Sequence, residues 1–121
     1  MKSACGRLLA LIAVFLVTMW IATEWPKTDR ELLSQENWPV TVEQVVRDLL
    51  PRMTPFEKAE VIFTRKRDLF VLHFGLGLWI RNGYGLWRGN EKLIFSACGF
   101  RCHPDEASMK IIEAVWEALH T

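Results

Sequence analysis

Residues 68–82 decide the expected fold, and their sequence is DLFVLHFGLGLWIRN. The stretch is apolar on nearly every side and long enough to form a central buried helix. Spacings of four, three and four residues place on one helical face Leu69, His73, Leu76 and Ile80. The glycines at 75 and 77 point to nearly opposite sides, which predicts close approach of neighbouring backbones on both flanks. The alternative is that the helix breaks at these glycines and exposes backbone amides to a ligand.

Capping residues predict two helices before this stretch. Thr41 followed by Gln44 has the spacing of a capping box, and the helix that it opens ends at Pro51. Thr54 is the expected N-cap of a second helix, over about residues 55–64, with proline at its first position.

Two further helices are expected after it. Asn90 caps a short helix that stops at Gly99. Pro104 and Asp105 start the last helix, with Asp105 as its N-cap. The inward stripe of that helix consists of Ser108, Ile111, Ile112, Val115, Trp116 and Leu119. Because no run alternates as a strand does, the expected fold is all-α, a small compact bundle of about five helices.

The amino terminus has the order of residues typical of an export signal. Lys2 and Arg7 precede an apolar run over residues 8–22, and polar residues follow it. As a helix the run would span ~22 Å of a bilayer core of ~30 Å, which is short for a transmembrane helix. Cleavage after Ala22 would, however, place the bulky Trp20 where a small residue is preferred. Retention as a signal anchor is therefore favoured over a cleaved signal peptide.

These features predict three regions. Residues 1–25 are the signal peptide or signal anchor, residues 26–40 a linker, and residues 41–121 the helical domain. The cations before the apolar run would hold the amino end in the cytoplasm, so we expect inner-membrane anchoring through residues 8–22 with the domain in the periplasm. If the signal is cleaved, the alternative is a soluble periplasmic or secreted protein.

Length and charge exclude some classes of function. A chain of 121 residues is too short for a multidomain enzyme. With 15 Lys plus Arg against 14 Asp plus Glu, it lacks the broad basic field on which many nucleic-acid binders depend. We therefore expect no nucleic-acid partner, and no motif indicates a cofactor.

Three motifs, HFGLGLWIRN, GLWRGN and HPDEAS, resemble the signature of an uncharacterised bacterial family, a domain of unknown function. The resemblance covers Val42 to Leu119. Residues that match the first two motifs are His73, Gly75, Gly77, Trp79, Arg81, Asn82, Gly85, Leu86 and Trp87; those that match the third are His103, Pro104, Asp105 and Ser108. Glu106 departs from the aspartate that is common there. The resemblance implies a small helical domain and no known activity.

Arg81 and Asn82 lie at the expected end of a helix, beside a glycine-rich loop. A guanidinium there caps helix carbonyls or pairs with a carboxylate such as Asp105. The functional alternative is a clamp for an anion or carboxylate, walled by Trp79, Trp87 and Arg88.

The sequence CxxxCH places Cys98, Cys102 and His103 close together. In an oxidising compartment the simplest expectation is a disulfide between the two cysteines, with free thiols and a metal site as alternatives. Ser108, Asp105 and the histidines His73 and His103 could in principle form a hydrolase triad, but the chain lacks a nucleophile turn or triad spacing. No residue is therefore predicted to be catalytic, and none to hold a metal.

The preferred functional hypothesis is a non-catalytic binding module for a protein partner on the exported side, such as an immunity-type inhibitor or an adaptor. The loop from Gly83 to Asn90 offers its contact residues, Tyr84, Trp87, Arg88 and Asn90. One alternative is a binder of an anionic or sugar-like envelope ligand, gripped by Arg81, Trp87 and His103. A further alternative is a metal-assisted enzyme that uses the two cysteines and His103.

Overall fold

The computed structural model describes residues 33–121, so the predictions for the apolar run and the first part of the linker lie outside the described residues. Within this range the chain is all-helical, as predicted. Five α-helices and no strand occur there: α2 (Val42–Leu49), α3 (Pro55–Phe63), α4 (Leu78–Gly83), α5 (Glu91–Cys98) and α6 (Pro104–Leu119). None of these helices is long and apolar enough to cross a membrane.

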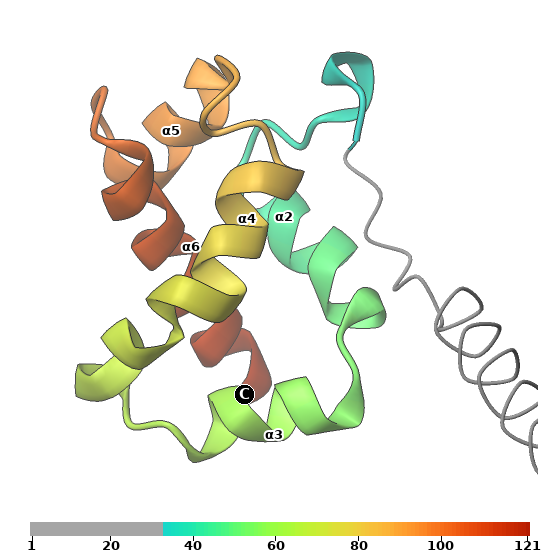
Figure 1. The fold of residues 1–121 in the computed structure, drawn as a ribbon, viewed down its shortest axis with the longest axis vertical. Coiled ribbons are helices and arrows are strands. Elements are labelled where there is room, and N and C mark those ends of the chain that lie inside the picture. Colours follow the sequence, from blue (N-terminus) through green and yellow to red (C-terminus); the bar gives the residue numbers. More distant parts are fainter. Residues whose placement is uncertain (1–32) are drawn as a thin grey trace, which may run out of the picture.

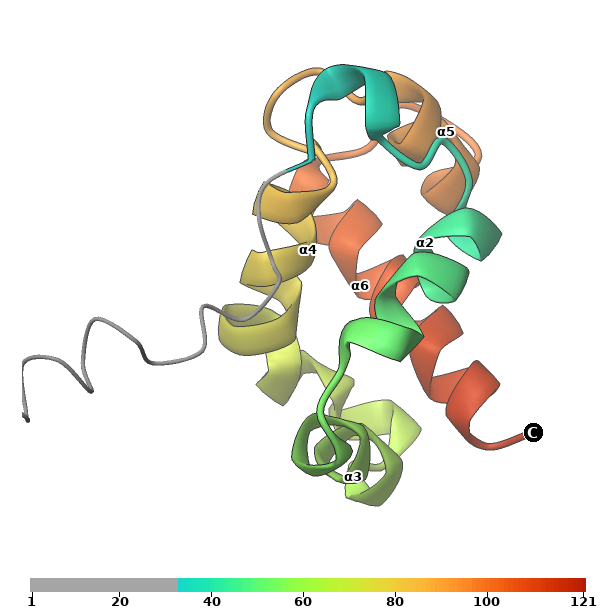
Figure 2. The same ribbon diagram turned by 90° about the vertical axis from the view of Figure 1, so that its right-hand side faces the viewer.

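Helix α6 forms the centre of the bundle. It packs against all four other α-helices and against the segment that precedes α4 (Figure 1). Seen from the side, α6 runs between α4 and α2, with α3 across one end and α5 at the other (Figure 2). Its buried stripe contains Ala107, Ser108, Ile111, Ile112 and Val115. The prediction that residues 68–82 form the central helix is therefore wrong, because α6 occupies that place.

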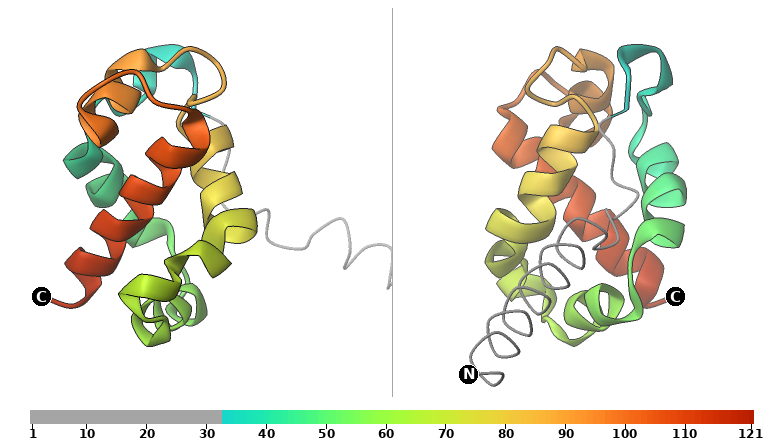
Figure 3. Two further views of the ribbon diagram at one scale, coloured as in Figure 1. Left: turned by 90° about the vertical axis from the view of Figure 1, so that its left-hand side faces the viewer. Right: turned by 45° about the vertical axis from the view of Figure 1, so that its right-hand side comes forward.

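Residues 66–83 form three successive helical pieces. A 3-10 helix, η3 (Lys66–Leu72), leads into a π-helical turn, η4 (His73–Gly77), and then into α4. The segment lies along one flank of α6 (Figure 3). Because α6 covers only one side of it, the opposite side faces solvent. A Cβ at position 77 would lie 3.0 Å from the Arg81 guanidinium, whereas one at position 75 would meet nothing. The predicted close approach on both flanks is therefore wrong for Gly75, and at Gly77 the nearest group is a side chain.

The predicted N-caps are present with one exception. The hydroxyl of Thr41 accepts a hydrogen bond from the amide of Gln44, and that of Thr54 accepts one from Glu57. At α6 the capping residue is His103, whose Nδ1 accepts a hydrogen bond from the Asp105 amide at 3.1 Å, so the prediction of Asp105 as the N-cap is wrong. Proline at the first helical position accounts for the shift, because it places the cap immediately before itself.

The end of the predicted linker is part of the folded domain. Trp38 follows a short 3-10 helix, η1 (Gln35–Asn37), and its ring lies against Gly85. Gly85 has a φ of 73°, and a Cβ at this position would collide with the Trp38 indole. Two independent constraints, a left-handed backbone and a close ring, therefore require glycine at 85.

Candidate functional site

The buried Arg81 side chain joins the segment of residues 73–83 to α6. It is only 3% exposed. Nη1 donates to Ser108 Oγ at 3.0 Å, and Nη2 donates to the His73 carbonyl at 3.1 Å. Nε lies 3.5 Å from a carboxylate oxygen of Asp105, which confirms the ion pair that was one of the two sequence interpretations. Since these contacts engage all three nitrogens inside the fold, Arg81 is not free to clamp a ligand in this structure.

Arg81 also fixes the ring of His73. Its Nη1 lies 3.3 Å from His73 Nδ1, and because a guanidinium only donates, this nitrogen acts as the acceptor. The imidazole ring stacks on Phe70 with a centroid distance of 5.4 Å and meets the edge of Phe74 at 4.9 Å. The buried network therefore holds an aromatic trio at the surface of the domain.

A groove of about 580 Å³ lies beside this trio. Its lining residues come from η3, η4, the end of α5, the turn before α6 and the outer face of α6. We call it the phenylalanine groove, and its residues are Phe70, His73, Cys98, Phe100, Asp105, Glu106, Met109, Lys110 and Glu113. Phe70 is 66% exposed and Phe100 is 59% exposed, while Phe74, which flanks the groove, is 77% exposed. Aromatic rings with this exposure, gathered around a concave surface, are typical of binding sites.

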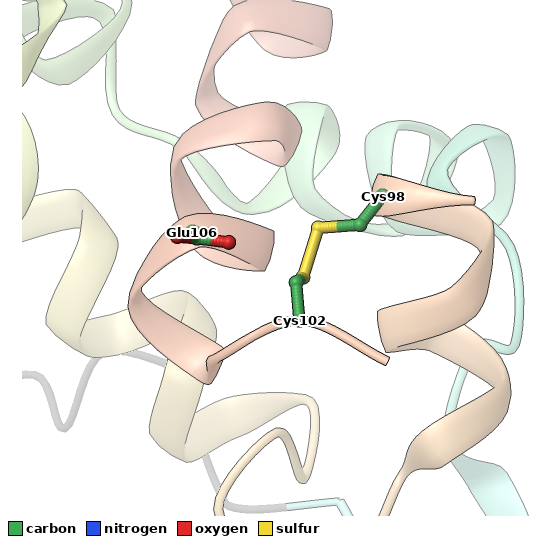
Figure 4. A group of neighbouring side chains, drawn as sticks. All are labelled: Cys98, Cys102 and Glu106. Atoms are coloured by element: carbon green, nitrogen blue, oxygen red, sulfur yellow. A yellow bond between two sulfur atoms is a disulfide. The ribbon is translucent and has the colours of Figure 1, made fainter. Parts of the chain in front are cut away.

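A disulfide borders the groove through Cys98. The sulfur atoms of Cys98 and Cys102 are bonded to each other, and Glu106 on α6 lies beside them (Figure 4). The bond closes a short loop that carries Phe100 and ties the end of α5 to the turn before α6. One oxygen of Glu106 and both sulfurs lie within 4.8 Å of one another. Since a metal is bound by thiolates, the two sulfurs offer no ligands while the disulfide is formed.

Of the predicted contact residues, Trp87, Arg88, Asn82 and His103 lie at the surface. The rings of Trp87 and His103 meet edge to face at 5.3 Å, so the structure brings these two residues together. Arg88 donates to the Asn82 carbonyl at 3.1 Å, and its guanidinium lies 5.0 Å from the ring centre of Trp38. Arg88 is thus held against its own domain.

Tyr84 and Asn90 are buried, contrary to the expectation that both offer contact surface. Tyr84 is 1% exposed, and its hydroxyl donates to Asp48 at 2.8 Å. The amide nitrogen of Asn90 donates to the carbonyls of Tyr84 and Pro39 at 2.8 and 2.9 Å. The side chain of Asn90 also caps α5 by accepting from the Leu93 amide. In this structure both residues stabilise the loop from inside the domain and offer no contact surface.

The residues that sequence reasoning missed are the apolar members of the phenylalanine groove. Phe70 and Phe74 lie four residues apart, on a different face from Leu69 and His73. That spacing could have indicated an aromatic surface stripe. It could not reveal Phe100 or Met109, because only the fold brings the turn before α6 and the face of α6 beside η3 and η4.

Comparison with known protein families identifies the helical domain as one unit. Residues 38–119 match the model of a family described as "Domain of unknown function (DUF6794)". The chain belongs to this family. The match begins at Trp38, the residue that packs on Gly85, so the family's domain includes the end of the predicted linker. No curated protein and no solved structure matches the chain.

Proposed function

We propose that this chain is a non-catalytic binding module that receives an apolar segment of a protein partner in the phenylalanine groove. The observation that carries the proposal is the placement of phenylalanine. All six phenylalanines of the described range are exposed, namely Phe56, Phe63, Phe70, Phe74, Phe95 and Phe100. Phenylalanine is ordinarily among the most buried residue types, and Phe70 and Phe100 of this set line one groove with Phe74 beside it, which favours this part of the exposed surface as the part that a partner covers.

The groove is the best-built part of this exposed surface. A hydrogen-bonded arginine fixes the ring of His73 between two phenylalanines, and a disulfide fixes the loop that carries Phe100. Fixed aromatic rings lose little conformational entropy when a partner binds. A surface that is already ordered before binding suits recognition of a protein segment.

The place of action that we propose is the exported side of a membrane, with residues 8–22 as the anchor. The support for it is the apolar run after Lys2 and Arg7. The partner would then be an exported or periplasmic protein, and the module an adaptor for it or an immunity-type inhibitor of it.

Site-specific photocrosslinking of the full chain in its native cells tests the groove as the contact surface. A benzoylphenylalanine at position 100 replaces one aromatic ring with another and is expected to give one discrete protein adduct. The same label at position 87 tests the surface formed by Trp87 and His103. A label at position 43, on the exposed side of α2, serves as the background control.

Second-site changes give the decisive comparison. Phe70→Ser, across the groove, should remove most of the adduct formed at position 100, whereas Phe95→Ser should leave it unchanged. Phe95 is the matched control because it is equally exposed and lies on α5 outside the groove. A strong adduct at position 87 with none at position 100 would overturn the groove proposal.

A further inference from the structure

We infer that the segment received by the phenylalanine groove is cationic and amphipathic, with a lysine or arginine that pairs with Glu106. This inference rests on the proposed function and names the chemistry of the partner. The groove is lined by the apolar side chains of Phe70, Phe100 and Met109 and by charged side chains of α6, which we call its rim. The charge expected of the partner segment depends on which of these rim charges already have a partner of opposite charge within the domain.

Three of the four rim charges have partners. Asp105 lies 3.5 Å from the buried guanidinium of Arg81, which offsets its charge. Lys110 Nζ lies 3.9 Å from a carboxylate oxygen of Glu113, so the charges of these two residues offset each other.

Glu106 is the rim charge that remains. Within residues 33–121 its carboxylate makes no hydrogen bond or ion pair. It lies one helical turn before Met109 and Lys110, so all three line the same side of α6. Its oxygen also lies within 4.8 Å of the two disulfide sulfurs, at the apolar wall of the groove.

An uncompensated carboxylate beside an apolar surface selects among partners. A segment that covers the phenylalanine rings also removes water from Glu106, and an unpaired desolvated charge opposes binding. A lysine or arginine next to the apolar side chains removes that penalty, whereas an acidic residue there adds repulsion. The groove is therefore complementary to a basic amphipathic segment and discriminates against an acidic one.

The test uses the full chain in nanodiscs of zwitterionic phosphatidylcholine, with carbon-13 in the methionine methyl groups. The probes are two amphipathic helical peptides of about 18 residues with one leucine face, in which the polar face is all lysine or all glutamate. Met109 lines the groove and reports its occupancy, while the buried Met53 is the internal control. We expect the lysine peptide to shift the Met109 methyl resonance and leave Met53 in place, with affinity about tenfold above that of the glutamate peptide.

Variants separate the inference from the proposed function. Glu106→Gln should lower the affinity for the lysine peptide about fivefold, and Glu36→Gln, at an exposed site outside the groove, should not change it. Phe100→Ser should weaken both peptides. If both peptides bind equally and Phe100→Ser weakens both, the cationic inference fails and the groove proposal stands. If neither peptide moves the Met109 resonance, or if Phe100→Ser leaves binding unchanged, the groove proposal itself fails.

Discussion

The glycine-rich loop at residues 83–90 and the phenylalanine groove show opposite relations between residue type and burial. The loop is rich in glycine and polar residues, yet Tyr84, Leu86 and Asn90 in it are buried. The segment at residues 68–78 is rich in leucine and phenylalanine, yet Phe70 and Phe74 in it are exposed. Composition alone therefore misplaces part of each region.

Hydrogen bonding explains the first region. The carbonyls of Pro39 and Tyr84 converge on one point, and the Asn90 amide donates to both. A loop with its own internal donor can be covered by neighbours, because few of its backbone groups then need water. The ring of Trp38 covers Gly85 on the outside.

Of the changes that test this comparison, Asn90→Ala is expected to have the largest effect on the stability of the domain. The change removes two buried hydrogen bonds and the N-cap of α5. We expect a loss of about 3 kcal/mol in the free energy of unfolding of the full chain, measured by denaturant unfolding followed by tryptophan fluorescence. Asn82→Ala is the matched control, since Asn82 is exposed in the same part of the chain, and its effect should stay within about 0.5 kcal/mol. Equal effects of the two changes would show that the loop is not held through Asn90.

Removal of the disulfide beside the groove is expected to have a smaller effect on stability. Replacing Cys98 and Cys102 together by serine opens a short closed loop, for which chain entropy predicts a loss of about 2 kcal/mol. The same change frees Phe100 and should weaken photocrosslinking from position 100, while a label at position 87 serves as the control. Full retention of the position-100 adduct would show that the disulfide does not order the groove wall.

The helices could be predicted from the sequence because capping residues and helix-ending residues act locally. Thr41, Thr54 and Asn90 cap the helices that they were expected to cap. The pairing of Arg81 with Asp105 could be predicted too, because an arginine near the end of one helix was expected to pair with a carboxylate in the first turn of another. Which helix lies at the centre could not be predicted from hydrophobicity, because residues 68–82 are the more apolar stretch and yet α6 is the helix that contacts all the others. The central position depends on which helix faces pack against other helices. Because residues 68–82 pack on one side only, Phe70 and Phe74 on the other side are exposed.

The smallest expected effect concerns the ion pair at the outer edge of η3. Lys66 Nζ lies 2.6 Å from a carboxylate oxygen of Glu117, and this hydrogen bond, together with the charge of Glu117, raises the pKa of Lys66 above 10.5. A raised pKa means that the contribution to stability is fully present below pH 10.5 and is lost as the pH rises through the pKa of the folded state. Because both side chains are solvent-exposed, Lys66→Gln should lower Tm only slightly at about pH 8. The difference from wild type should shrink as the pH rises through the raised pKa of Lys66, whereas Lys92→Gln, which changes an exposed lysine of α5, should show no such dependence. A Lys66→Gln effect that persists at high pH would assign the stabilisation to packing of the lysine stem against Trp116, whose ring centre lies 5.8 Å from Nζ.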